Sequence, residues 1–135
     1  MWDKMFGSVD LLQNGLSAAW ERNAVIRNNI ANVETPGFKA SNVEFESILA
    51  RSLENGGFQG KKTRDKHIAI GADDAFSVRH AVTKSNGLSM RMDGNNVDIE
   101  AENVKLAQNT ILYNTMLEKM NSELRRIKLA INEGR

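Results

Sequence analysis

The sequence of 135 residues contains no cysteine, a single proline and no long apolar run. The absence of cysteine excludes a disulfide scaffold and thiolate chemistry. No segment approaches the length of a membrane-spanning helix, so we expect no direct membrane insertion. Residues 1–6 begin an amphipathic pattern instead of a basic segment followed by an apolar one, so we predict that the chain has no cleaved secretory signal.

An excess of charge of one sign is also lacking. Eighteen Lys and Arg residues face seventeen Asp and Glu residues, which gives a formal net charge of +1. Such a balance indicates neither a nucleic-acid footprint nor a membrane-surface patch. One short basic cluster, residues 61–66, is interrupted by Asp65 and has only Phe58 nearby for base stacking. We therefore predict no nucleic-acid partner.

Patterns typical of catalytic and metal sites are missing as well. The chain has no nucleophile elbow, no phosphate-binding loop and no dinucleotide fingerprint. His67 and His80 lie far apart and have no cysteine to complete a zinc site. Residues 93–98 begin like a calcium loop, but Val97 and Val104 occupy positions that require oxygen ligands. We therefore predict a protein that is not an enzyme and that holds no metal and no cofactor.

Two long segments carry apolar residues that alternate in steps of four and three, the spacing of a coiled-coil seam. The first seam comprises Met5, Val9, Leu12, Leu16, Ala19, Asn23, Ile26, Ile30 and Val33, and the second comprises Ile99, Asn103, Leu106, Thr110, Tyr113, Leu117, Met120, Leu124, Ile127 and Ile131. This pattern predicts a mainly α fold in which long N- and C-terminal helices, residues 1–34 and 97–135, pack as a coiled-coil-like pair. An irregular central segment, residues 35–96, joins them.

Local signals mark the inner ends of both helices. Pro36 has no N–H to donate and Gly37 adopts positive φ readily, so Thr35 to Phe38 is predicted to form a type II turn. The first helix should therefore end by about Val33. Asp98 is suited to cap the second helix at its N-terminus.

The central segment carries weaker patterns. Residues 42–53 have a helical apolar period, which predicts a short helix. Residues 67–70 and 75–79 alternate weakly, which predicts a small β-hairpin across residues 71–74. Residues 93–96 form a strong turn signal directly before the second helix.

Both seams allow two interpretations, because stripes at helical spacing can form an intramolecular core or contacts between molecules. Pairing the two seams within one monomer would leave off-seam apolar residues without cover: Leu11, Ala18, Trp20, Val25, Ile111, Leu112, Met116 and Leu129. Asn28, Asn29 and Asn32 also have two readings. They could cap the helix end, or they could hold the turn against a neighbouring molecule.

Asn29-Ile30-Ala31-Asn32, followed by Thr35-Pro36-Gly37-Phe38, resembles the N-terminal signature of the bacterial flagellar axial proteins, which include rod and hook subunits. The short chain resembles the basal-body rod proteins of this family, as does the run Asp93 to Asp98 that enters a helix with Leu106-Ala107-Gln108-Asn109 and Tyr113. A larger rod or hook protein would carry an inserted domain that this chain lacks.

The resemblance implies a structural subunit of the tubular rod in the periplasmic part of the basal body. It also implies export by the flagellar type III apparatus without a cleaved signal peptide. The implied partners are other rod subunits and the export-gate and ring junction proteins. Candidate subunit-interface residues are Leu12, Leu16, Ile26, Ile30, Leu106, Tyr113, Leu117, Leu124 and Ile127, and the junction motif comprises Asn29, Asn32, Thr35, Pro36, Gly37 and Phe38. The alternative is a small helical adaptor or secretion chaperone that acts as a closed dimer.

Overall fold

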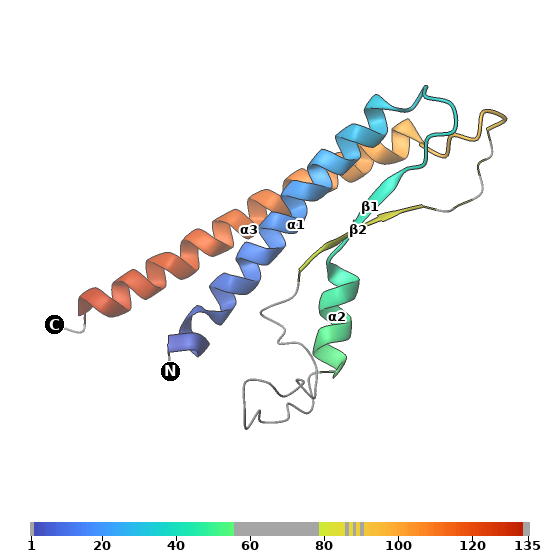
Figure 1. Ribbon diagram of the computed structural model, residues 1–135. Helices are drawn as coiled ribbons and strands as arrows, with labels where there is room; N and C mark the ends of the chain where they lie inside the picture. The colour runs from blue at the N-terminus through green and yellow to red at the C-terminus, as the bar shows by residue number, and fades with distance from the viewer. Residues whose placement is uncertain (1, 56–78, 86, 88, 90, 134–135) are drawn as a thin grey trace.

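Two long antiparallel helices form the body of the molecule, and a small sheet and a short helix lie along one side of it (Figure 1). The computed structural model describes residues 2–55, 79–85, 87, 89 and 91–133. The elements are α1 (Trp2–Ala31), β1 (Ser41–Glu44), α2 (Glu46–Asn55), β2 (Ala81–Lys84) and α3 (Ile99–Glu133). At about 1.5 Å per residue, α1 is roughly 45 Å long and α3 roughly 52 Å long. The predicted mainly α fold with paired terminal helices is confirmed.

The helices approach each other closely because small residues of α1 face α3. A Cβ built at Gly15 would lie 3.0 Å from Sδ of Met116, and Ala19 is almost fully buried. The amide of Asn109 on α3 donates to the Ala19 carbonyl at 2.8 Å. Contacts of this kind allow side chains of each helix to fit between those of the other, as in a coiled coil.

The predicted helix ends are confirmed. The regular part of α1 ends at Ala31, and hydrogen-bonded turns continue to Val33. At the start of α3, Oδ1 of Asp98 accepts hydrogen bonds from the backbone N–H groups of Glu100 (3.0 Å) and Ala101 (3.2 Å). Asp98 is therefore the N-cap of α3.

The strands β1 and β2 pair antiparallel, with Ser41 opposite Lys84 and Glu44 opposite Ala81. A helix beginning at residue 42 was thus the wrong prediction for the first part of that segment, since α2 begins only at Glu46. The local helical period could not reveal the strand partner, which lies about forty residues further along the chain. The predicted hairpin of residues 67–79 lies almost entirely outside the described residues.

The apolar core is thin. Ala18 and Phe45 are buried together, and Leu11, Ile48 and Leu49 pack against them, so that α2 covers one side of α1. Large apolar side chains are left exposed along both long helices: Trp20, Val104, Ile111, Leu112, Leu117, Leu124, Leu129 and Ile131. A surface of this kind is typical of a protein that binds others.

Candidate assembly interface

The Thr35 to Phe38 turn has the predicted type II geometry. Gly37 has a φ of 71°, and the backbone N–H of Phe38 donates to the carbonyl of Thr35 at 3.3 Å. A second positive-φ glycine, Gly94 (φ 76°), faces it, and a Cβ at Gly94 would lie 3.7 Å from the Gly37 Cα. The N–H of Gly37 also donates to the carbonyl of Asp93 at 2.8 Å. The two turns are therefore packed directly against each other.

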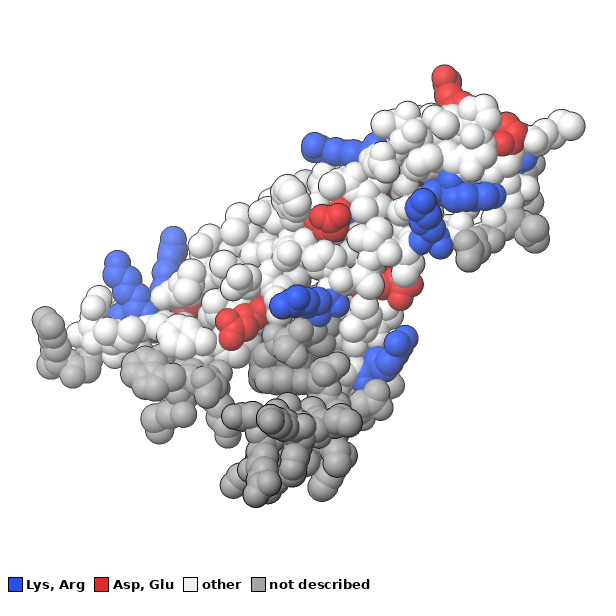
Figure 2. Space-filling view, viewed as in Figure 1, with Lys and Arg blue, Asp and Glu red and all other residues white. Residues whose placement is uncertain are grey.

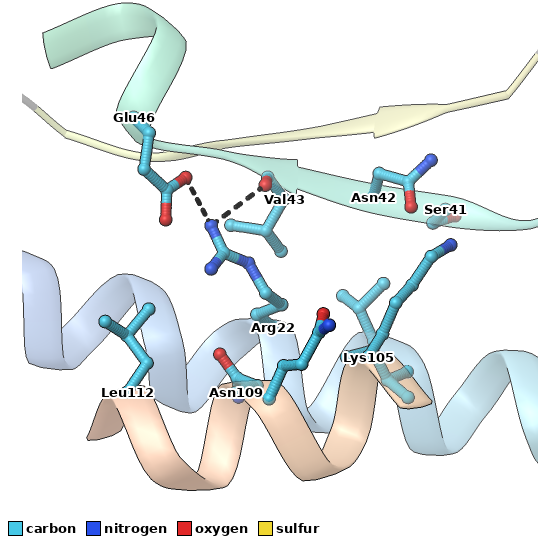
Figure 3. Close-up of a pocket in the computed structure, with 11 residues that line it drawn as sticks. Arg22, Ser41, Asn42, Val43, Glu46, Lys105, Asn109 and Leu112 are labelled. Carbon is cyan, nitrogen blue, oxygen red and sulfur yellow. Dashed lines mark hydrogen bonds and ion pairs between the residues drawn. The ribbon is translucent and has the colours of Figure 1, made fainter. Parts of the chain in front are cut away.

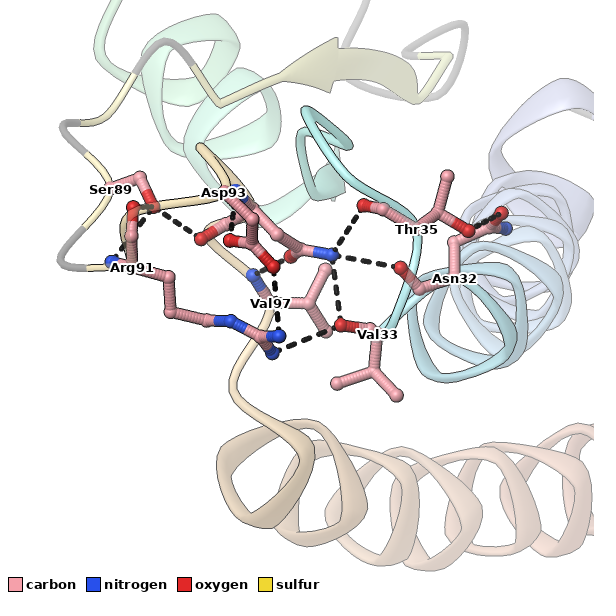
Figure 4. Close-up of polar contacts among 8 residues, drawn as sticks. Asn32, Val33, Thr35, Ser89, Arg91, Asp93 and Val97 are labelled. Carbon is pink, nitrogen blue, oxygen red and sulfur yellow. Dashed lines mark hydrogen bonds and ion pairs between the residues drawn. The ribbon is translucent and has the colours of Figure 1, made fainter.

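Asn95 joins the end of α1 to the segment that leads into α3. Figure 4 labels the residues at the end of α1 that its side chain contacts, Asn32, Val33 and Thr35. The Asn95 side chain is fully buried, and its Nδ2 lies 2.9 Å from the carbonyl oxygens of Asn32, Val33 and Thr35. Its Oδ1 accepts from the N–H of Val97 at 2.8 Å. The last carbonyls of a helix have no intrahelical donors, and this one amide adds a donor to three carbonyl oxygens just beyond the end of α1.

Arg91 adds positive charge at the same place. It donates to the Val33 carbonyl at 3.1 Å, and its guanidinium lies 2.8 Å from the carboxylate of Asp93. That carboxylate in turn accepts from the backbone N–H of Asn95 at 3.0 Å. A cation at this position interacts favourably with the negative end of the α1 macrodipole.

Asn29 forms a second buried connection, one turn before the end of α1. Its Nδ2 donates to the Ser41 carbonyl (2.9 Å) and to Oε2 of Glu102 (3.0 Å), and its Oδ1 accepts from the Ser41 N–H (3.0 Å). Lys105 neutralises the other oxygen of Glu102 at 2.6 Å. A single side chain therefore ties α1 to both β1 and α3, and Asn29 is engaged within its own chain.

Asn32 is bonded locally. Its amide donates to the carbonyl oxygen (2.8 Å) and to Oδ1 (3.0 Å) of Asn28, and its own Oδ1 accepts from the Thr35 hydroxyl at 3.3 Å. Of the two readings of these asparagines, helix-end capping describes Asn28 and Asn32. Pro36, Gly37 and Thr35 are exposed, so the outer surface of the turn is open to a neighbour.

The face of α3 that packs on α1 differs from the predicted seam. Leu106, Tyr113, Met120 and Ile127 are partly buried, as that seam requires. Its other members include Leu117 and Leu124, which are 38% and 43% exposed. Their places are taken by residues one position earlier in each heptad: Glu102, Asn109, Met116 and Glu123.

Glu102, Asn95 and Asn109 are buried polar residues that the apolar seams did not indicate as contacts. Glu102 and Asn109 are buried polar residues seven positions apart on the packed face of α3. The apolar period predicts that their apolar neighbours lie in the interface instead. A polar residue is stable in a helix interface only if the fold supplies its hydrogen bonds. Nothing in the local sequence could reveal those partners.

Most of the remaining interface candidates lie at or beside the contact of the two helices. Ile26 is buried, and Leu12, Leu16 and Ile30 are partly buried. One side of the helix pair is left uncovered, and we call it the open face: Leu12, Leu16, Trp20, Asn23 and Arg27 on α1, with Thr110, Tyr113, Leu117 and Leu124 on α3. It contains a hollow of about 540 Å³ whose lining includes Trp20, Asn23, Arg27, Thr110 and Tyr113.

The opposite side of the helix pair is partly covered by β1. A groove of about 340 Å³ lies there, and Arg22 reaches across it to Glu46 at 2.5 Å and to the Val43 carbonyl at 3.5 Å (Figure 3). Burial raises the pKa of Glu46, but the hydrogen bond and the charge of Arg22, together with backbone hydrogen bonds, outweigh this effect and hold the pKa below its usual value. The buried Oδ1 of Asn109 has no hydrogen-bond partner among the described residues.

Charges of both signs are scattered over the face shown in Figure 2, with wide uncharged areas along the helices. On α3, the hydrogen bond from Lys119 is the main cause that lowers the pKa of Glu123, and Arg126 adds to it. No group of three acidic or histidine residues that could hold a metal ion occurs in the described part of the chain. Within that part, no helix is both long and apolar enough to cross a membrane.

Comparison with known proteins identifies the family of this chain. Residues 10–39, which include α1 from Asp10 onwards and the turn, match the family model described as flagella basal body rod protein. The chain is 34% identical over 129 residues to the flagellar basal body rod protein FlgB of Bacillus subtilis (strain 168), with 96% of each chain covered. The chain belongs to the FlgB family of flagellar basal body rod proteins.

Other members of this family show similar coverage. The FlgB protein of Aeromonas hydrophila is 35% identical over 125 residues, covering 91% of this chain and 89% of the relative. That of Proteus mirabilis (strain HI4320) is 30% identical, covering 99% and 100%. The chain is accordingly a structural component of the flagellar basal body rod and not an enzyme, as predicted.

Proposed function

We propose that the chain is a subunit of the proximal rod that reaches the periplasm through the flagellar type III apparatus without a cleaved signal peptide. Its partners would be other rod subunits and the export-gate and ring junction proteins. In this proposal the polar junction holds α1, β1 and α3 as one unit. The open face then makes the contacts between subunits.

The observation that carries the proposal is the exposure of apolar residues at predicted interface positions. Leu117 and Leu124 recur at a heptad interval on the side of α3 that borders the hollow of the open face. The monomer leaves the exposed part of each leucine in water, whereas an assembly would bury it. Each fully buried leucine contributes roughly 1.5–3 kcal/mol.

The test replaces one exposed leucine with a carboxylate. Leu117→Asp or Leu124→Asp should destabilise the isolated chain only modestly, because 38% and 43% of these residues' surfaces are already exposed in it. Either change should remove the subunit from purified basal bodies, since an unpaired charge in a desolvated interface costs several kcal/mol. The readout is subunit in the periplasm or medium compared with subunit in basal bodies.

Lys119→Glu is the matched control. Lys119 lies between the two leucines in sequence, but its exposed side chain points away from the open face and pairs at 3.2 Å with Glu123, at the other edge of the packed face. Exposed pairs contribute only about 0–1 kcal/mol, so incorporation should persist. If Lys119→Glu blocked incorporation and both aspartate variants assembled, the open face would be the wrong interface.

A further inference from the structure

The α1 side of the open face presents a stripe of four residues. They recur in steps of four, three and four along the helix: Leu16, Trp20, Asn23 and Arg27. Trp20 is 65% exposed and lines the hollow together with Asn23 and Arg27. A large exposed aromatic beside a hollow is the usual form of an anchor for another chain.

A second stripe lies on the outer side of α3, turned away from α1. Its members follow the same steps of four, three and four: Glu100, Val104, Ala107 and Ile111. All four are exposed, and Val104 and Ile111 are among the large apolar side chains that no described element covers.

The two stripes are complementary when they run antiparallel. Glu100 then faces Arg27, the small side chain of Ala107 faces the bulky Trp20, and Ile111 faces Leu16. Among the described residues, neither Arg27 nor Glu100 takes part in an ion pair. The charges, the volumes and the spacing therefore agree.

We propose that the α1 stripe of one copy receives the α3 stripe of a second copy of this chain. The proposal rests on the proposed function and names one partner of the open face. Within a single molecule α1 and α3 are already antiparallel, so this contact keeps all copies pointing the same way. Because the two stripes differ, the contact is heterologous, and it continues from copy to copy instead of closing as a dimer.

Cross-linking in the assembled basal body tests the contact, since the chain has no cysteine of its own. Cells would express two tagged forms together, one with Ala24→Cys beside the α1 stripe and one with Ala107→Cys in the α3 stripe. A short bis-maleimide should join the two forms, and neither form alone should dimerise. Replacing the first form with Arg51→Cys, an exposed position on α2, is the control and should give no product.

Charge exchange gives a second, independent measurement. Arg27→Glu alone should lower the amount of subunit in basal bodies roughly five-fold, as expected for the loss of one pair and its reversal into repulsion. Adding Glu100→Arg to the same chain should restore most of it.

The outcomes separate the two proposals. If the parent chain were absent from basal bodies, the proposed function would fail. If the parent were present but Ala24→Cys cross-linked to a different rod protein, or if the exchanged pair were no better than Arg27→Glu, the second-copy contact would be overturned.

Discussion

Removing the Asn29 amide should strongly destabilise the isolated chain. Asn29→Ala deletes hydrogen bonds to the Ser41 carbonyl, from the Ser41 N–H and to Glu102. Each buried group left without a partner costs about 1–3 kcal/mol. Because Ser41 is only partly buried and Lys105 still pairs with Glu102, we expect a total near 3–5 kcal/mol.

That loss is a large part of the roughly 5–15 kcal/mol by which domains are stable. The assay is urea unfolding followed by circular dichroism at a fixed chain concentration. With a slope of about 2 kcal/mol per molar urea, the midpoint of unfolding should fall by about 2 M. If the parent chain is only marginally stable, the Asn29→Ala variant should already be partly unfolded without urea.

Two further variants make the reasoning refutable. Asn28→Ala, at an exposed position one residue earlier, should change the free energy of unfolding by less than about 0.5 kcal/mol. Asn29→Asp places a second carboxylate beside Glu102, and protonation of either one removes their mutual repulsion, so the deficit of this variant relative to the parent should shrink as pH falls from neutral. Equal midpoints for Asn29→Ala and Asn28→Ala would show that the buried connection does not stabilise the fold.

Three other outcomes are expected. Gly37→Val should reduce incorporation into basal bodies while export persists, because a β-branched residue disfavours a φ of 71°. The cause would be backbone strain and not a steric clash, since no described atom lies within 4 Å of the added Cβ. Normal motility of this variant would contradict the prediction. The pKa of Glu46 is lowered in the folded chain, so its pair with Arg22 stabilises the fold at neutral pH, and this contribution is lost as pH falls through that pKa. Arg22→Gln should therefore reduce the loss of unfolding free energy between neutral and acid pH by less than about 1 kcal/mol. An unchanged pH dependence would count against the pair. Hydrogen exchange of the dilute chain should be slowest in the last three turns of α1 and fastest beyond Met116, and uniform protection along α3 would exclude this gradient.

Local signals carried much of the prediction. The end of α1, the type II turn at Gly37 and the Asp98 cap were all predictable, because each depends on what one residue can do with its own backbone: proline lacks an N–H, glycine tolerates positive φ, and aspartate accepts from the next turn. The alternating period likewise determined that two long helices would exist and pair. The resemblance of the Asn29 to Phe38 motif added the family.

Only the tertiary structure decided which face of α3 meets α1 and why β1 is a strand. Glu102 and Asn109 replace the apolar residues expected at those positions because their hydrogen bonds end on Asn29 and Ala19, at least seventy residues away in the sequence. Residues 42–44 belong to a segment with the apolar period of a helix, but β1 pairs with β2, and the backbone of Ser41 bonds to the Asn29 amide. A buried polar group is stable only beside its partner, and a partner that distant is brought close by folding alone.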